Sequence, residues 1–319
     1  MKTILKYIMK NRAVLLMIVM SLFTIINVKA QYEPMFTQYM FNETFINPAY
    51  VGSHENVSIT LLSRNQWVGI EGAPKTQTFS IHSPINGHRF GIGLAVRNEN
   101  IGVSHQLGVY TNFAYRILFD NSALSFGLQG GFVNDESRYT EVLTTTPGDN
   151  QFSSDTRKVF LPNAGFGIYY FREKFYAGFS IPRLIENNVT PSLTNGSVQN
   201  SWNIENWHYY FATGYVFDLN EDHKFKPSIL VKAVQNAPVQ LDVDANFLLK
   251  NFLWLGASYR SGDAIAAIIG FQVNKQLRFG YSYDYTLSKL QKYNSGSHEF
   301  TLGYEILIDR SRINSTRYF

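Results

Sequence analysis

The run Leu277-Arg278-Phe279-Gly280-Tyr281-Ser282-Tyr283-Asp284-Tyr285 decides the fold, because large apolar residues alternate in it with small or polar ones. Side chains of a strand point alternately to its two faces, so this run predicts a strand with one apolar and one polar face. The same alternation recurs over residues 241–247 (LDVDANF) and 299–306 (EFTLGYEI). No window of helical period competes with these runs, and they predict an all-β protein.

Runs of this kind extend along the chain and predict about fourteen antiparallel strands. They cover residues 56–66, 75–84, 88–98, 104–118, 122–135, 161–171, 174–183, 206–219, 223–235, 238–249, 252–261, 264–273, 275–287 and 297–308. Many span about ten residues, the length that a tilted strand needs to cross a bilayer. With 20 Tyr, 25 Phe and only 16% charged residues, the chain suits a transmembrane β-barrel.

The lengths of the connections give an independent test of this interpretation. Connections after even-numbered strands are short, at residues 119–121, 220–222, 250–251 and 274–275. The long connections follow the first, fifth, seventh and thirteenth strands, at residues 67–74, 136–160, 184–205 and 288–296. Outer-membrane barrels have short periplasmic turns and longer extracellular loops, so this sorting favours a barrel. A soluble β-sandwich shares the alternation but gives no reason for the sorting, and it remains a distant alternative.

The first thirty residues differ from the rest of the chain. Residues 2–12 contain four basic side chains and precede an apolar run at residues 13–28, and Ala30 is a small residue at a plausible cleavage position. This pattern predicts a secretory signal peptide over residues 1–30. The leader also accounts for the net charge of +4, because the remaining chain carries 23 Lys and Arg against 24 Asp and Glu. Nucleic-acid binding therefore has no support in the composition.

The segment between the leader and the first strand, residues 31–55, lacks the strand period but is rich in apolar side chains. Its candidate plug or docking residues are Phe36, Tyr39, Phe41, Asn47, Pro48 and Tyr50. So much apolar surface requires burial. We expect either a plug or docking surface in the lumen or across the periplasmic mouth, or an extended lead-in clamped against the barrel wall. The barrel then occupies residues 56–308, and residues 309–319 form a periplasmic tail.

Polar residues on the alternating strands are expected to face the lumen, because a charge facing lipid at the bilayer midplane costs a few kcal/mol. The predicted polar interior contains Lys232, Asp242, Asp244, Arg278 and Asp284. Aromatic residues near strand ends, such as Tyr210 and Trp254, suit either interfacial girdles or ordinary core.

Several short motifs resemble the PorP/SprF family of outer-membrane proteins, which is associated with type IX secretion and gliding motility. The N-terminal block consists of residues 38–42 (QYMFN), 46–53 (INPAYVGS), 64–70 (RNQWVGI), 72–78 (GAPKTQT) and 82–84 (HSP). The resemblance continues through residues 162–167 (PNAGFG), 176–178 (YAG), 296–299 (GSHE) and 317–319 (RYF). It implies a barrel of fourteen strands without enzymatic activity that works with periplasmic ring components or with secreted cargo.

Enzymatic motifs are absent from the sequence. The seven histidines show no metal-ligand spacing, no Gly-x-Ser-x-Gly elbow occurs, and the chain has no cysteine, which excludes disulfides and thiolate metal sites. His82 and Ser83 are neighbours on a strand and point to opposite faces, so they cannot form a dyad. We expect no enzymatic activity, no cofactor and no metal.

The expected function is that of an integral barrel in the outer membrane, with both termini periplasmic. It would anchor or receive an exported protein that carries a type IX sorting domain, and it would dock to periplasmic or outer-membrane components of the secretion ring. Candidate contacts for the cargo lie in an extracellular loop at Trp202, Asn203 and Trp207. The alternative is an outer-membrane transporter or porin for small molecules, which include hydrophobic ones.

Overall fold

The computed structural model describes residues 34–85, 88–141, 155, 159–190, 197–235 and 237–307, so the predicted leader and tail lie outside the described residues. Among the described residues, no helix is long and apolar enough to cross a membrane. The strands are β1 (Val57–Asn65), β2 (Lys75–Ile85), β3 (Phe90–Ile101), β4 (Ser104–Leu118), β5 (Ser122–Ser137), β6 (Val159–Arg172), β7 (Phe175–Ile181), β8 (Glu186–Thr190), β9 (Ser197–Ser201), β10 (Tyr209–Tyr215), β11 (Phe217–Asp218), β12 (Lys224–Ala233), β13 (Gln240–Leu249), β14 (Leu253–Arg260), β15 (Ala264–Gln272), β16 (Leu277–Thr286) and β17 (Ser297–Ile306).

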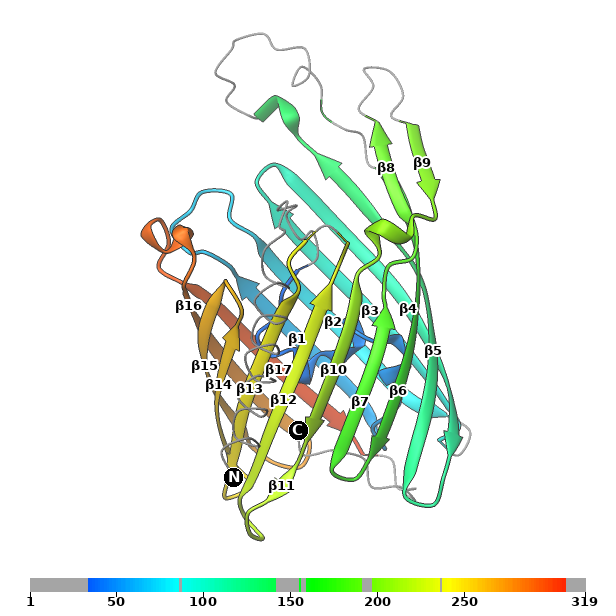
Figure 1. Ribbon diagram of the computed structural model, residues 1–319, viewed down its shortest axis with the longest axis vertical. Coiled ribbons are helices and arrows are strands. Elements are labelled where there is room, and N and C mark those ends of the chain that lie inside the picture. Colours follow the sequence, from blue (N-terminus) through cyan, green and yellow to red (C-terminus); the bar gives the residue numbers. More distant parts are fainter. Residues whose placement is uncertain are drawn as a thin grey trace, which may run out of the picture.

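All strands except β8 and β9 form one antiparallel sheet that closes on itself (Figure 1). The first strand, β1, pairs with the last, β17, and β10 pairs with both β7 and β12. The short β11 continues β10 after Val216 and pairs with the same strand, β12, so the wall has fourteen strands. The predicted fourteen-strand antiparallel barrel is confirmed. Closure leaves the described barrel wall without a free edge strand. Such closure is necessary in lipid, which offers no hydrogen bonds to an unpaired edge.

Two details differ from the predicted strands. The strand predicted over residues 174–183 ends earlier, because β7 stops at Ile181 and Pro182 has no N–H with which to continue the ladder. The loop predicted over residues 184–205 contains a hairpin, β8–β9, whose strands pair with each other and stand apart from the wall (Figure 1).

The period of two separates a lipid face from a lumen face. On β13, Asp242 and Asp244 are each 1% exposed. The neighbouring Leu241 and Val243 are 37% and 40% exposed. The exposed apolar side chains face the bilayer, and the buried polar ones face the lumen.

The residues before β1 lie inside the barrel as three short 3₁₀ helices, which are η1 (Tyr39–Phe41), η2 (Glu43–Phe45) and η3 (Pro48–Tyr50) (Figure 1). We call residues 34–56 the lumen segment. Its apolar side chains form one buried cluster with inward aromatic residues of the wall, including Tyr169, Tyr176 and Trp254. This cluster is the hydrophobic core of the molecule.

Glycines on the inner face give the lumen segment its space. A Cβ added at Gly127 on β5 would collide with the backbone of Ala49, and one added at Gly167 on β6 would collide with the Asn47 side chain. These two glycines are opposite each other across the β5–β6 ladder, so together they make a notch that receives η3.

A valine at this notch tests the fit. We expect Gly127→Val to lower the free energy of unfolding by about 1 to 3 kcal/mol, because the new side chain must displace η3. Urea titration of the folded protein in lipid vesicles, followed by tryptophan fluorescence, measures the change. Gly130→Val is the matched control on the same strand, since a Cβ there meets no atom within 4 Å. Equal stability of the two variants would contradict the tight fit.

Candidate functional site

The lumen segment runs along the barrel from the end with long loops to the end with short turns. Near the loop end, the N–H of Thr37 donates to Glu299, which lies close to the start of β17. Near the turn end, Nδ1 of His54 lies 3.0 Å from Oε1 of Glu305, close to the end of the same strand. The first described residue, Pro34, borders a cavity at the loop end. The N-terminus, which we expected in the periplasm, lies outside the described residues.

A buried cluster of charges holds the beginning of the lumen segment. The Arg64 guanidinium donates to Asp284 at 2.7 Å and to Glu299 at 3.1 Å, and all three side chains are at most 2% exposed. The other bonds of Glu299 come from the lumen segment, because its two oxygens accept the backbone N–H groups of Thr37 and Gln38 at 3.0 and 2.7 Å. Three separate parts of the chain are therefore joined at one buried arginine.

A second cluster adjoins the first across β12, β13 and β14. Lys232 and Arg260 each place a nitrogen 3.3 Å from Oδ2 of Asp242. Arg260 also lies 3.3 Å from Asp263 and 3.5 Å from Asp284, which links the two clusters. Each charge of these two clusters thus has a partner of opposite sign, as low-dielectric surroundings require.

The structure places all five predicted lumen residues on the inner strand faces, but it does not bring them to one place. Lys232, Asp242 and Asp284 belong to the two clusters. Asp244 lies opposite Ser258 on the β13–β14 ladder. Arg278 lies near the turn end, stacked on the Phe41 ring with 3.9 Å between its guanidinium carbon and the ring centroid.

Sequence reasoning missed Arg64, Arg260 and Glu299 as members of this site. Glu299 could have been predicted as a lumen residue, because it begins the polar face of the same alternating run that predicted β17. Arg64 and Arg260 lie at the ends of their strands, where the period alone does not separate lumen from surface.

Wall hydroxyl groups hold the middle of the lumen segment. Ser125 on β5 donates to the carbonyl of Ala49 at 2.7 Å, and Ser180 on β7 donates to the carbonyl of Ile46 at 2.6 Å. The Asn47 side chain caps η3 by accepting the N–H of Ala49, with Pro48 at the first helical position. Asn47 and Pro48 therefore shape the segment, and the serines tie its carbonyl groups to the wall.

Aromatic contacts dominate the turn-end half. Phe41 meets Trp254 edge-on, with ring centroids 5.6 Å apart. Trp254 and Tyr210 are 3% and 7% exposed and belong to the buried core, so they do not form an interfacial girdle. The Tyr50 hydroxyl lies 2.8 Å from Nε2 of His54.

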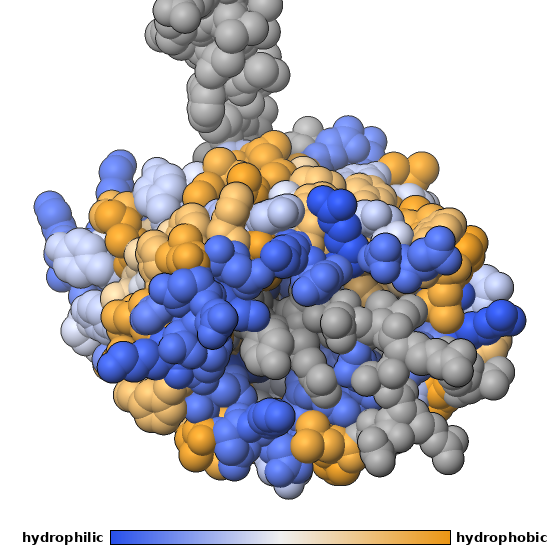
Figure 2. Space-filling model, turned by 90° about the horizontal axis from the view of Figure 1, so that it is seen from below, coloured by the Kyte–Doolittle hydropathy of each residue, from blue (hydrophilic) through white to orange (hydrophobic). Residues whose placement is uncertain are grey.

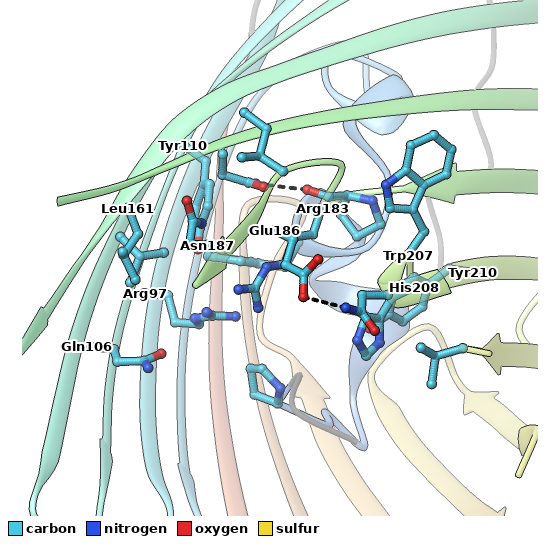
Figure 3. A pocket seen from close by; sticks show the side chains of 18 of the residues that line it. Arg97, Gln106, Tyr110, Leu161, Arg183, Glu186, Asn187, Trp207, His208 and Tyr210 are labelled. Atoms are coloured by element: carbon cyan, nitrogen blue, oxygen red, sulfur yellow. Dashed lines mark hydrogen bonds between the residues drawn. The ribbon is translucent and has the colours of Figure 1, made fainter. Parts of the chain in front are cut away.

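Two cavities lie on either side of the lumen segment. The loop-end vestibule has a volume of about 610 Å³, and Phe36 and Phe45 of the lumen segment border it. Figure 3 shows Arg97, Gln106, Tyr110 and Leu161 on one side of it and Trp207, His208 and Tyr210 on the other. The turn-end vestibule, of about 990 Å³, is bordered by Met40, Phe41 and Tyr50 together with wall residues.

The three predicted loop residues differ in their surroundings. Trp202 is 67% exposed, beside Ile204 at 61% in η6 (Ile204–Asn206). The Asn203 side chain accepts the N–H of Glu205 and caps η6. The Trp207 indole donates to the carbonyl of Leu184 at 3.0 Å and lines the loop-end vestibule. Trp202 is thus an outward apolar surface, while Asn203 and Trp207 also shape the loop.

The closed wall, its apolar outer face and its occupied lumen define an integral β-barrel of the outer membrane. The family model described as type IX secretion system membrane protein PorP/SprF matches residues 28–304, and the chain belongs to this family. The resemblance inferred from the sequence is confirmed, and the protein is an outer-membrane barrel of the type IX secretion system family.

Solved barrels are similar in outline at low sequence identity. The Acinetobacter baumannii outer membrane protein Omp33 is 8% identical to this chain, with a TM-score of 0.46, over 79% of this chain and 99% of that one. The CymD monoaromatic hydrocarbon channel is 8% identical, with a TM-score of 0.49, over 89% of this chain and 96% of that one. The KdgM porin is 9% identical, with a TM-score of 0.38, over 79% of this chain and 100% of that one. No curated protein matches the sequence.

Metal chemistry finds no support in the described part of the chain, where no group of three or more His, Asp or Glu side chains is placed to hold an ion.

Loss of the central arginine should be costly. We expect Arg64→Met to lower the free energy of unfolding by about 3 to 5 kcal/mol, because it leaves the buried Glu299 without its cation and Asp284 with only the more distant Arg260. Adding Glu299→Gln in the same chain should restore part of the loss. Urea unfolding measures both, with Lys289→Met at the exposed η7 (Lys289–Lys292) as the control that should change little. A loss no larger than that of the control would refute the role of this cluster.

The position of the lumen segment can be measured by cross-linking, since the chain has no native cysteine. Nδ2 of Asn42 donates to Oγ1 of Thr78 on β2 at 3.1 Å. The pair Asn42→Cys and Thr78→Cys should therefore form a disulfide on mild oxidation, detected by mass spectrometry of digested peptides. Asn42→Cys with Asn98→Cys, whose second site is an exposed polar contact on β3, should not. Equal yields from the two pairs would contradict the observed position.

Proposed function

We propose that this barrel is a non-enzymatic, closed subunit that anchors or receives an exported surface protein at its loop end and docks to secretion-ring components at its turn end. The proposal rests above all on the lumen segment, residues 34–56, which occupies the barrel in place of an open channel. Membership of the PorP/SprF family supports the secretion context.

The contacts of the lumen segment support a closed state. They reach β2 at Thr78, β5 at Ser125, β7 at Ser180, and β16 and β17 at the Arg64 cluster, and so go around the wall. A segment held from several sides by buried hydrogen bonds and by a glycine notch does not leave without breaking them. These contacts support the proposal that the lumen segment acts as a plug. The polar, charged face of the lumen argues against an apolar route for hydrophobic molecules.

The loop end supports the receptor role. Trp202 and Ile204 present apolar surface on an extracellular loop, and exposed tryptophan is typical of the residues that dominate binding energy in protein interfaces. The loop-end vestibule beside them is lined by aromatic and amide side chains such as Tyr110, Asn187 and Trp207. We propose that the type IX sorting domain of the exported protein, or a segment next to it, binds there.

The turn end supports docking in the periplasm. Figure 2, which looks onto this end, shows hydrophilic residues around the middle of the face and a mixture of apolar and hydrophilic residues toward its edge. The hydrophilic residues around the middle suit a water-exposed contact with another protein. The apolar residues at the edge suit contact with the membrane. The tail of residues 309–319 is proposed to take part in the same contact.

Affinity purification in mild detergent tests the receptor role. The tagged barrel from its own outer membrane should co-purify with an exported surface protein and with ring components, identified by mass spectrometry. We expect Trp202→Ala to reduce the recovered exported protein by about tenfold, the effect of losing an interface anchor, and to leave the ring components unchanged.

The control is Tyr293→Ala, which removes another exposed aromatic side chain, 70% exposed, from a different extracellular loop. Unchanged recovery with Trp202→Ala would exclude Trp202 as an anchor. Recovery of the barrel alone, together with steady ion conductance in planar bilayers, would favour the transporter or porin alternative.

A further inference from the structure

Arg278 differs from the other arginines on the inner face of the barrel. Those others have partners in the protein, which are carboxylates for Arg64, Arg97 and Arg260 and the carbonyl of Phe90 for Arg116. In the part of the chain that the structure describes, the Arg278 guanidinium makes a stacking contact with Phe41 but no hydrogen bond or ion pair, and its Nε is buried.

The stacking leaves the donors of Arg278 available. A guanidinium that lies on an aromatic ring uses its flat face, whereas its N–H groups point outward in the plane of the group. Arg278 and Phe41 both line the turn-end vestibule, so this donor-bearing edge borders a cavity of about 990 Å³. The edge of a guanidinium matches two oxygens of one carboxylate or phosphate.

The carboxylates nearest this cavity are already engaged. Oε1 of Glu305 lies 3.0 Å from Nδ1 of His54, and its Oε2 accepts from Asn56 at 2.9 Å. Glu55 is 6% exposed and has its own partner, and Glu221 lies exposed in the turn before β12. Two lysines line the same cavity: Lys224 lies 3.6 Å from Asp218, and Lys275 is an exposed residue of the turn before β16. Among the described lysines and arginines that line the vestibule, Arg278 is therefore the one on the inner face of a wall strand that has no carboxylate partner.

We propose that the turn-end vestibule is an oxyanion-binding site centred on Arg278, which takes a carboxylate or phosphate group that arrives from the periplasm. The guanidinium binds the two oxygens in its plane, and Phe41 holds that plane in position. Because Phe41 belongs to η1 and Arg278 to β16, the bound anion contacts the lumen segment and the wall together. Binding of the anion at this site therefore stabilises the lumen segment in its position inside the barrel.

Thermal unfolding of the full-length protein in detergent tests the site. The probes are inorganic phosphate and glutarate, each replacing chloride at constant pH and ionic strength. A ligand that binds only the folded state raises its melting temperature. We expect a rise of a few degrees with at least one probe, and its loss in Arg278→Gln. Arg278→Lys, which keeps the charge but not the planar fork, should lose most of the rise.

The control is Lys289→Gln, which removes one exposed cation at the opposite end of the barrel and should keep the full rise. Electrophoretic mobility before and after heating shows whether each variant is folded. A rise with phosphate alone assigns a phosphate ligand, and one with glutarate alone assigns a carboxylate, such as an acidic side chain of a protein. No rise in the parent protein with either probe, or an equal rise in Arg278→Gln, would overturn the proposal.

Discussion

Lipid hydrocarbon offers no hydrogen bonds, and the rest of this structure depends on that constraint. Every backbone N–H and C=O in the bilayer must find a partner in the protein, so the sheet closes through the β1–β17 and β10–β12 ladders. Closure forces half of the side chains inward, and the alternation of the strands makes that half polar. The interior then contains charged groups that need partners. Either water in the lumen or a segment of protein must supply those partners.

The lumen segment meets this need near the loop end. Glu299 has no exposed surface, and it is satisfied by Arg64 and by two backbone N–H groups of the lumen segment. The segment in turn gains partners for N–H groups that a short 3₁₀ helix leaves unbonded. Wall and segment are thus complementary, and neither buries its polar groups well without the other.

The two ends of the barrel differ in chemistry for the same reason. At the loop end, long connections allow a hairpin, β8–β9, and an exposed Trp202 to stand beyond the wall. At the turn end, short turns leave a wide polar mouth whose inner surface combines the lumen segment with β16 and β17. One packed segment separates the two vestibules, and this arrangement is the basis of the function proposed above.

The sequence by itself determined about fourteen strands and their faces, because the period of two and the lengths of the connections can be read along the chain. It identified Asp242, Asp244 and Asp284 as inward residues on the same ground. Its short motifs, such as residues 46–53 (INPAYVGS), resembled the family. It left open whether residues 31–55 would fill the lumen or line the wall, since apolar content requires burial but does not name the surface. Only the tertiary structure places the lumen segment, residues 34–56, inside the barrel, with Gly127 and Gly167 against η3 and with Arg64 bound to Glu299, 235 residues away in the chain. Contacts between residues so distant depend on barrel closure and strand register, and no local pattern contains them.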